Sequence, residues 1–140
     1  MTARRDWLAV ASAEHVARGF DAGFMQVCHG KSAPLRRLRA GDRIAYYSPG
    51  PVTGGPATLK SITAFGVVAD EMLEQVEMAP GFCPWRRRVD WISARAVPID
   101  RLRQDPRFVL AGHGWGAKLR FGLLAIDAAS MDMIEKAMSG

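Results

Sequence analysis

The sequence predicts an α+β fold, in which a mixed sheet curls into a partly closed barrel with helices around it. Apolar runs of strand length recur along the chain, whereas helical spacing of apolar residues is confined to short segments. The 140 residues are 49% hydrophobic and 24% charged, which is typical of one globular domain. We therefore expect a single domain over residues 1–140.

The N-terminal elements are predicted as a strand, a helix and a second buried segment. Residues 7–11 form an apolar run, and apolar residues recur at helical spacing after Ser12, a residue type that caps helices. Gly19 and Gly23 bracket the expected end of this helix. Residues 24–28 then form a short buried segment that leads into a loop at residues 29–34.

A one-turn helix and several strands are expected in the middle of the chain. The helix turns Leu35 and Leu38 inward and closes at Gly41 in the left-handed conformation. Its outward side chains are Arg36, Arg37 and Arg39. Residues 49–56, rich in proline and glycine, predict a loop. The strands expected around this loop, the last two in one sheet, are residues 42–48, 60–69 and 85–97.

Toward the C-terminus, the pattern predicts two helices and one strand. Asp100 is expected to cap a short helix that Pro106 limits, and residues 119–126 predict a nearly continuous buried strand. Ser130 is expected to cap the last helix. Its inward side chains are Met131, Ile134 and Met138.

Tryptophan and arginine share one face of the strand predicted at residues 85–91. That face carries Trp85, Arg87, Val89 and Trp91, and the opposite face carries Arg86, Arg88 and Asp90. Aromatic rings stack on bases while guanidinium groups contact phosphates. A core tryptophan flanked by solvated arginines is the preferred interpretation for Trp91, whereas a binding role is preferred for Trp85.

The charge balance favours a polyanionic partner. The formal charge is +5, and fifteen arginines stand against four lysines, a choice suited to bidentate phosphate contacts. A general preference for arginine codons would give the same composition. Cys28 and Cys83 are too few for a disulfide framework, so we expect a cytoplasmic protein, and no segment has the character of a signal peptide or membrane span.

Three motif-like patterns do not meet the requirements of their sites. Residues 29–32 resemble the end of a phosphate-binding loop, but Met25 occupies the position of its first glycine. Residues 112–117 match a dinucleotide fingerprint, yet a strand is expected after them and not a helix. The side chains of zinc-ligand type, which lack zinc-site spacing, are Cys28, His29, Cys83 and His113. No cofactor or metal is expected, and the glycines around Trp115 predict a loop that exposes its indole.

Three segments of the chain stand out together: W-L-A-V-A-S with His15, G-F-M-Q-V-C-H-G-K with Pro34-Leu35, and G-D-R-I-A-Y-Y-S-P at residues 41–49. In these segments the chain resembles the EVE domain family of the PUA-like superfamily, in its bacterial single-domain branch. Weaker matches follow in the expected order at residues 65–66, 85–91, 115–116 and 120–122. The resemblance covers nearly the whole chain.

The resemblance implies a PUA-like fold, with a mixed, mostly antiparallel curled sheet or pseudo-barrel of five to six strands and flanking helices. Related YTH domains hold a methylated adenine in an aromatic cage, and EVE domains are thought to recognise modified bases in DNA or RNA. A nucleic-acid-binding module for a modified base, and not an enzyme, is therefore implied. Residues 10–13 and 26–31 differ from the corresponding segments of eukaryotic relatives, Lys-Ser-Glu-Pro and an asparagine-rich loop, which leaves the ligand open.

The expected pocket combines this resemblance with residue chemistry. Its ligand-binding residues are Ser12, Gln26, His29, Gly30, Lys31, Tyr47, Ser48, Trp85 and Trp115. The rings of Tyr47, Trp85 and Trp115 would stack on a flipped base, and the polar groups would read its edge. The residues expected at the nucleic-acid backbone are Arg36, Arg37, Arg39 and Arg87.

Two other functions stay open. ASCH proteins of the same superfamily hydrolyse acylated nucleosides, and Lys31 as base with Glu14 as acid would supply an amidohydrolase of that kind. A protein-interaction accessory module is the other alternative, in which exposed aromatic residues mark a partner surface.

Overall fold

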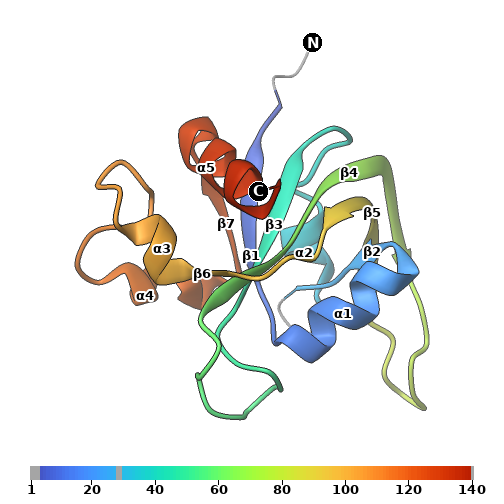
Figure 1. Cartoon of the computed structure of the whole chain (residues 1–140). Helices are drawn as coiled ribbons and strands as arrows, with labels where there is room; N and C mark the ends of the chain where they lie inside the picture. The colour runs from blue at the N-terminus through green and yellow to red at the C-terminus, as the bar shows by residue number, and fades with distance from the viewer. Residues whose placement is uncertain (1–3, 28–29, 140) are drawn as a thin grey trace.

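The computed structural model describes residues 4–27 and 30–139 and contains a curled mixed sheet with helices on both faces (Figure 1). The strands in these residues are β1 (Asp6–Val10), β2 (Phe24–Met25), β3 (Arg43–Ser48), β4 (Ser61–Gln75), β5 (Trp85–Ser93), β6 (Val97–Pro98) and β7 (Leu123–Ile126). The helices are α1 (Ala13–Ala22), α2 (Ser32–Leu35), α3 (Ile99–Arg103), α4 (Trp115–Lys118), α5 (Ala128–Ser139) and the 3-10 helix η2 (Leu119–Phe121). The predicted α+β class is confirmed, with seven described strands in place of the expected five to six.

The parallel strands β1 and β3 form the centre of a sheet whose strand order is β2-β5-β4-β3-β1-β7, with β6 paired to β4. Their pairing runs from Asp6 beside Arg43 to Val10 beside Tyr47, so both strands end at the same edge. The other pairs between described strands are antiparallel. Helices cover both faces of these two strands, which explains the unbroken apolar run at residues 7–11.

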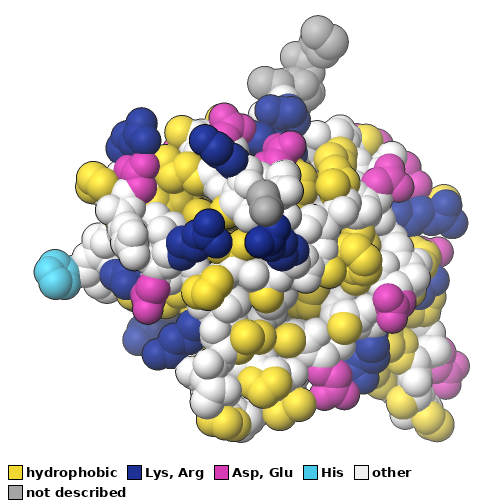
Figure 2. Space-filling view, in the orientation of Figure 1, with side chains coloured by type: hydrophobic (Ala, Val, Ile, Leu, Met, Phe, Trp, Pro, Cys, Tyr) yellow, Lys and Arg dark blue, Asp and Glu magenta, His cyan; other side chains and the backbone are white. Residues whose placement is uncertain are grey.

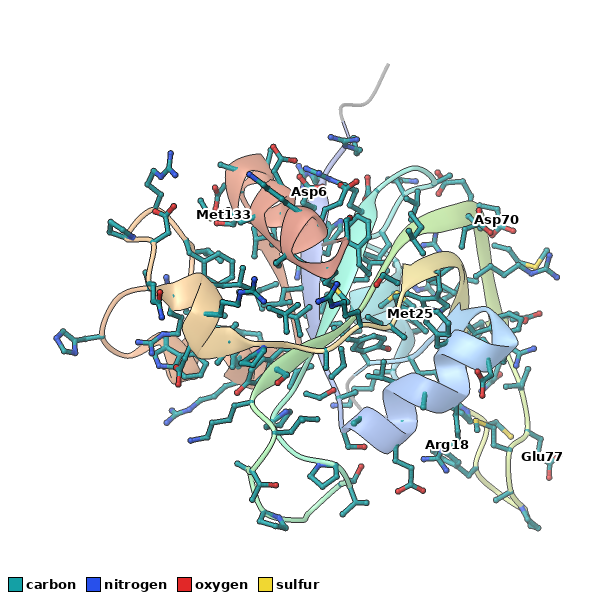
Figure 3. The ribbon with its side chains drawn as sticks, in the orientation of Figure 1. Asp6, Arg18, Met25, Asp70, Glu77 and Met133 are labelled. Atoms are coloured by element: carbon teal, nitrogen blue, oxygen red, sulfur yellow. The ribbon has the colours of Figure 1, made fainter. Side chains whose placement is uncertain are left out.

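Two apolar clusters fill the space on the two faces of the sheet. Leu8 points into one cluster together with Ile134 of α5. Trp7, the neighbour of Leu8 along the strand, points into the other cluster, which α1 and α2 cover. Figure 3 shows Met25 of this second cluster beside α1, whereas Arg18 lies on the outer side of that helix.

Several predicted helix features are confirmed. Ser12 is the N-cap of α1 and accepts a hydrogen bond from the His15 N–H at 3.3 Å, and Gly23 closes the helix with a φ of 79°. Gly41 adopts the predicted left-handed conformation with a φ of 89°, but it does not close the one-turn helix as expected, because α2 ends at Leu35 with Arg36 as its C-cap. The inward side chains of α5, all buried, are Met131, Ile134 and Met138. Within the described residues, no helix has the length and apolar character needed to cross a membrane.

Three C-terminal boundaries differ from the sequence prediction. Pro98 is the N-cap of α3, so Asp100 lies inside its first turn and does not cap it. Asp127 accepts hydrogen bonds from the Ser130 N–H at 3.1 Å and from its hydroxyl at 2.7 Å, which places Ser130 inside α5. Gly122 adopts a φ of 75°, and this left-handed conformation separates η2 from β7 within the predicted strand.

The stretch between the two long strands, for which the sequence predicted no structure, extends β4 and forms a hairpin. β4 continues to Gln75, which pairs with Trp85 at the start of β5. A hydrogen bond from the Phe82 N–H to the Ala79 carbonyl, at 2.8 Å, closes the turn. The hairpin extends away from the body of the sheet, and Figure 3 shows Glu77 at the periphery.

An ion-pair cluster ties the centre of the sheet to α5. Arg43 on β3 donates hydrogen bonds to Asp6 on β1 and to Asp132 on α5, each at 2.6 Å. The bond to Asp6 raises the pKa of Arg43 even though burial opposes it, so the guanidinium stays charged. Figure 3 shows Asp6 beside α5, at the end of the sheet where β1 begins. This cluster fixes the sheet at the end opposite to the strand ends described below.

Candidate functional site

A cavity of about 770 Å³ lies at the edge where the parallel strands β1 and β3 both end. It is lined by the end of β1, the first turn of α1, residues 26–27 and 30–31, the loop at residues 49–57, Phe82, and residues 119, 120 and 122. Most of these segments meet at the lower end of the sheet in Figure 1, although they are distant in sequence. Loops that follow parallel strands converge at one edge, which makes that edge a common binding position.

Small apolar residues and a few polar side chains form the wall of the cavity. The apolar part includes Val10, Ala11 and Val27. Ser12 also lines the cavity, and its hydroxyl accepts a hydrogen bond from the Thr53 hydroxyl at 3.3 Å. Further polar groups come from Gln26, whose amide nitrogen lies 3.2 Å from the Met78 sulfur, and from His15. Such a wall suits a flat, mostly apolar ring with a polar edge.

His15 contributes a neutral imidazole to this wall. Burial lowers the pKa of His15 below 6.5, a hydrogen bond to the Gln26 backbone opposes this effect, and the charge of Arg18 adds to it. The ring stands edge-on to Tyr46 with 6.4 Å between centroids. A neutral imidazole has one donor and one acceptor, and because the donor is used by the Gln26 backbone, His15 offers an acceptor to the polar edge of a ligand.

The cavity carries positive charge. Lys31 and Arg120 line it and are exposed, and none of its described lining residues is Asp or Glu. Glu14 stays outside the lining, with its side chain 3.8 Å from Arg18, so the described residues do not assemble the lysine–acid pair of the amidohydrolase alternative. On the face shown in Figure 2, Lys and Arg side chains lie among acidic and apolar ones. Attraction of a polyanion to the cavity therefore depends on local cations such as Lys31 and Arg120.

The N-terminus of α1 beside the cavity has its donors occupied. The N–H groups of Ala13 and Glu14 donate to the carbonyls of Gly50 and Pro51, each at 3.0 Å. The Ser12 hydroxyl accepts from the third N–H. Helix N-termini bind anions through such donors, so at this site an anion must be held by side chains instead.

Close backbone packing fixes the loops that line the cavity. Gly30 has a φ of 81°, and a Cβ at this position would lie 2.2 Å from the Pro84 Cβ. The Pro49 carbonyl accepts hydrogen bonds from the N–H groups of Leu59 and Lys60, each at 3.0 Å, which closes the loop that follows β3. Backbone contacts therefore set the shape of the opening.

Four of the nine predicted ligand-binding residues line this cavity. They are Ser12, Gln26, Gly30 and Lys31. Another of the nine, His29, lies outside the described residues. The residues that the structure brings together are thus those of the first helix cap and of the loop after β2.

The other predicted aromatic and hydroxyl residues do not line the cavity. Tyr47 and Ser48 are buried in β3, where Tyr47 packs edge-on against Trp115 at 6.0 Å and the Ser48 hydroxyl lies 2.7 Å from that of Thr63. Trp115 begins α4 with the Arg103 guanidinium 4.7 Å from its ring, so its indole is half-buried and not exposed at a loop tip. These side chains pack against the cluster that α5 covers.

The strand at residues 85–91 turns its mixed face inward. Trp85 packs against the cluster under α1, and Trp91 stacks on Tyr46 at 5.6 Å, which agrees with the core interpretation of Trp91. Arg87 is 2% exposed, so its guanidinium is inaccessible to a phosphate. Its guanidinium donates at 2.6–2.8 Å to the carbonyls of Leu35, Leu38 and Asp70. The predicted alternation is present, but it points Arg87 into the interior.

The three arginines of the α2 segment are exposed, as predicted. Arg37 lies 4.7 Å from the centroid of the Trp7 ring, and Arg39 stands 3.8 Å from Glu71. Arg36 and the other two are not part of the cavity lining. Arg37 lines a second hollow instead.

Several residues that line the cavity were not among the predicted site residues, and they include His15, Phe82 and Arg120. Phe82 is 46% exposed on the hairpin, a segment for which the sequence predicted no structure. His15 and Arg120 both fall in segments that resemble the family. His15 follows the helix cap Ser12, and Arg120 precedes Gly122. Their place in these segments is the sequence signal that could have identified them as site residues.

Comparison with known proteins places the chain in a family. The sequence model of the EVE domain matches residues 5–137. The UPF0310 protein msl3206 of Mesorhizobium japonicum is 47% identical over 134 residues, which cover 94% of this chain and 90% of that relative. The YTH domain of Zygosaccharomyces rouxii MRB1, solved in complex with N6-methyladenosine RNA, has a TM-score of 0.63 at 18% identity and covers 97% of this chain and 87% of its own. Human THYN1, solved in complex with 5-methylcytosine containing DNA, has a TM-score of 0.61 at 10% identity over 97% of this chain and 98% of its own. Both structures share the fold, and the sequence matches show that the chain belongs to the EVE domain family.

Proposed function

We propose that this protein binds nucleic acid and holds one modified base in the cavity at the ends of β1 and β3. The observation that carries the proposal is a cavity of about 770 Å³ whose charged described lining residues are both cations. This volume falls in the range of small-molecule sites, and the cations match the phosphates beside a base. Two solved proteins that share this fold were captured with methylated bases, which supports the same class of ligand.

Base and phosphate would be held by different residues. The side chains that offer neutral donors and acceptors to a base edge are Ser12, His15 and Gln26. The exposed ring of Phe82 supplies a flat stacking surface, a role that the sequence assigned to Tyr47, Trp85 and Trp115. The residues that would contact flanking phosphates are Lys31 and Arg120.

Preference for a modified base would follow from the apolar part of the wall. A methyl group adds apolar surface to the base without adding charge. Burying it against Val10, Ala11 and Val27 contributes about 1 kcal/mol, which is about fivefold in affinity. A preference of this size is readily measured with matched oligonucleotides.

Fluorescence anisotropy with short single-stranded oligonucleotides tests the proposal. A panel carries one methylated adenine or cytosine in DNA or RNA, and each member has an unmodified twin. We expect about fivefold tighter binding of at least one modified member than of its twin. Equal affinity within every pair contradicts the proposal.

Two variants and a matched control sharpen this test. Ala57→Trp places a bulky ring in the exposed loop that lines the cavity and should remove the preference for the modified member. Lys31→Ala should weaken binding to both members of a pair, because it removes a phosphate contact. Lys136→Ala on α5 removes an equally exposed charge outside the cavity lining and should change neither.

A further inference from the structure

A second hollow, of about 460 Å³, lies beside the cavity. Lys31 lines the cavity, while Ala33 and Pro34, close behind it in the chain, line the hollow. In the same way Arg120 lines the cavity while Phe121 lines the hollow. The same two segments of chain therefore form parts of both spaces, so the hollow lies next to the cavity.

The hollow is apolar apart from one arginine. Arg37 is the charged residue among its described lining residues. The Arg37 guanidinium lies 4.7 Å from the centroid of the Trp7 ring, and Trp7 is held in place by a 2.9 Å hydrogen bond from its indole N–H to Asp42. Across the described residues, Arg37 forms no ion pair. The guanidinium is thus positioned by an aromatic ring, and its charge is available to a phosphate.

Phe121 stands between the two spaces. Its side chain is 74% exposed, and it lines the hollow while both of its chain neighbours line the cavity. An exposed ring close to a guanidinium is the combination by which proteins bind single-stranded nucleic acid, because the ring stacks on a base and the cation contacts the backbone.

We propose that the hollow is a second nucleotide subsite, for the nucleotide next to the modified one. Its base stacks on Phe121 over the hollow, and its phosphate contacts Arg37. This inference rests on the proposed function and adds that the ligand is single-stranded over at least two nucleotides. In a duplex the neighbouring base stays paired and stacked, out of reach of an exposed ring.

Charge and position favour a nucleotide over a peptide in this hollow. The strand β7 lies at the end of the strand order and contributes Leu124 and Ala125 to the lining, so an extended peptide has an edge to pair with. The hollow, however, adjoins a cavity whose charged described lining residues are Lys31 and Arg120. A polymer with a phosphate at every step matches this row of cations.

Calorimetric titration with three ligands tests the subsite. The first is a modified mononucleotide. The second is a dinucleotide in which one neighbour is attached to it, made in two versions with the neighbour on the 5′ or on the 3′ side. The third is each of these dinucleotides with an abasic neighbour. For the wild type, we expect one of the two complete dinucleotides to bind about tenfold more tightly than its abasic form. Phe121→Ala should remove this gain and leave the mononucleotide unchanged. Ile92→Ala, at a similarly exposed apolar residue outside both spaces, should have no effect.

The outcomes separate this inference from the proposed function. A mononucleotide that binds selectively, with no gain from a neighbour base on either side, overturns the subsite and leaves the proposed function standing. Equal weakening of mononucleotide and dinucleotide by Phe121→Ala also overturns the subsite. Failure of every modified ligand to bind overturns both. An acidic peptide that binds more tightly than the dinucleotide, and loses its affinity in Phe121→Ala, assigns the hollow to a protein partner.

Discussion

Replacing Arg87 by methionine separates folding stability from nucleic-acid binding at a residue that the sequence assigned to phosphate contact. Methionine retains an apolar stem in the buried position and lacks the guanidinium. The carbonyls that would lose a donor, at distances of 2.6–2.8 Å, are those of Leu35, Leu38 and Asp70. Two of them belong to the segment that begins with α2, so the substitution removes the tie between that segment and β5.

The expected loss follows from these three bonds. A hydrogen bond to a charged group contributes about 1.5–3 kcal/mol, and a buried carbonyl left without a donor costs about 1–3 kcal/mol. Burial already lowers the pKa of Arg87, and its Nε has no hydrogen-bond partner in the described structure, so the native arginine carries an uncompensated desolvation cost. We therefore expect Arg87→Met to lose about 3 kcal/mol of unfolding free energy, against a total of about 7–20 kcal/mol for a chain of this length.

Urea denaturation followed by circular dichroism measures this loss. Arg88→Met is the matched control because the adjacent side chain is exposed on the opposite face, and its unfolding free energy should change by less than about 0.5 kcal/mol. An unchanged denaturation midpoint for Arg87→Met, combined with weaker oligonucleotide binding, would refute the reasoning. It would mean that the guanidinium contacts the ligand and not the three carbonyls.

Three further substitutions test other parts of the site. The pKa of His15 lies below 6.5 in the folded protein, so the unfolded chain binds the proton first; wild-type stability should fall as pH drops below about 6.5, and thermal melts should show this loss reduced in His15→Gln. Gly30→Ala should lower the melting temperature in calorimetry more than Gly54→Ala, since both have positive φ but only the former meets an atom at 2.2 Å. Arg120→Ala should reduce the slope of log affinity against log salt by about 0.7–0.9, whereas Arg101→Ala should not.

The central elements were predictable because local signals and burial agree in them. Ser12 and Gly23 occupy the two ends of α1 as their residue types require, and residues 7–9 of the apolar run are buried. The C-terminal caps were harder to place. Asp100 and Ser130 are good cap residues that lie just inside their helices, because Pro98 and Asp127 precede them.

The site was predictable only where its residues follow directly from strand and helix ends. Ser12 and Lys31 reach the cavity because the chain leaves the sheet beside them. Alternation along β5 correctly grouped Trp85 with Arg87, but it contains no information on which face is turned inward. Phe82 was missed because it lies on the hairpin between β4 and β5. The length of this hairpin depends on the pairing of the two strands, which local sequence patterns do not specify.

Arg87 shows how the interior supports the charged surface. Its guanidinium holds the carbonyls of Leu35 and Leu38, and the segment that contains them also carries Lys31, before Leu35, and Arg37, between the two leucines. Lys31 belongs to the cavity and Arg37 to the hollow, so one buried cation supports a segment that contributes an exposed cation to each space. Loosening this segment should therefore weaken the two subsites together, whereas Phe121→Ala, at an exposed side chain, should affect the hollow alone. Under the proposed function, the arginine that alternation assigned to phosphate contact would therefore act on phosphate binding indirectly, by fixing the segment that carries Lys31 and Arg37.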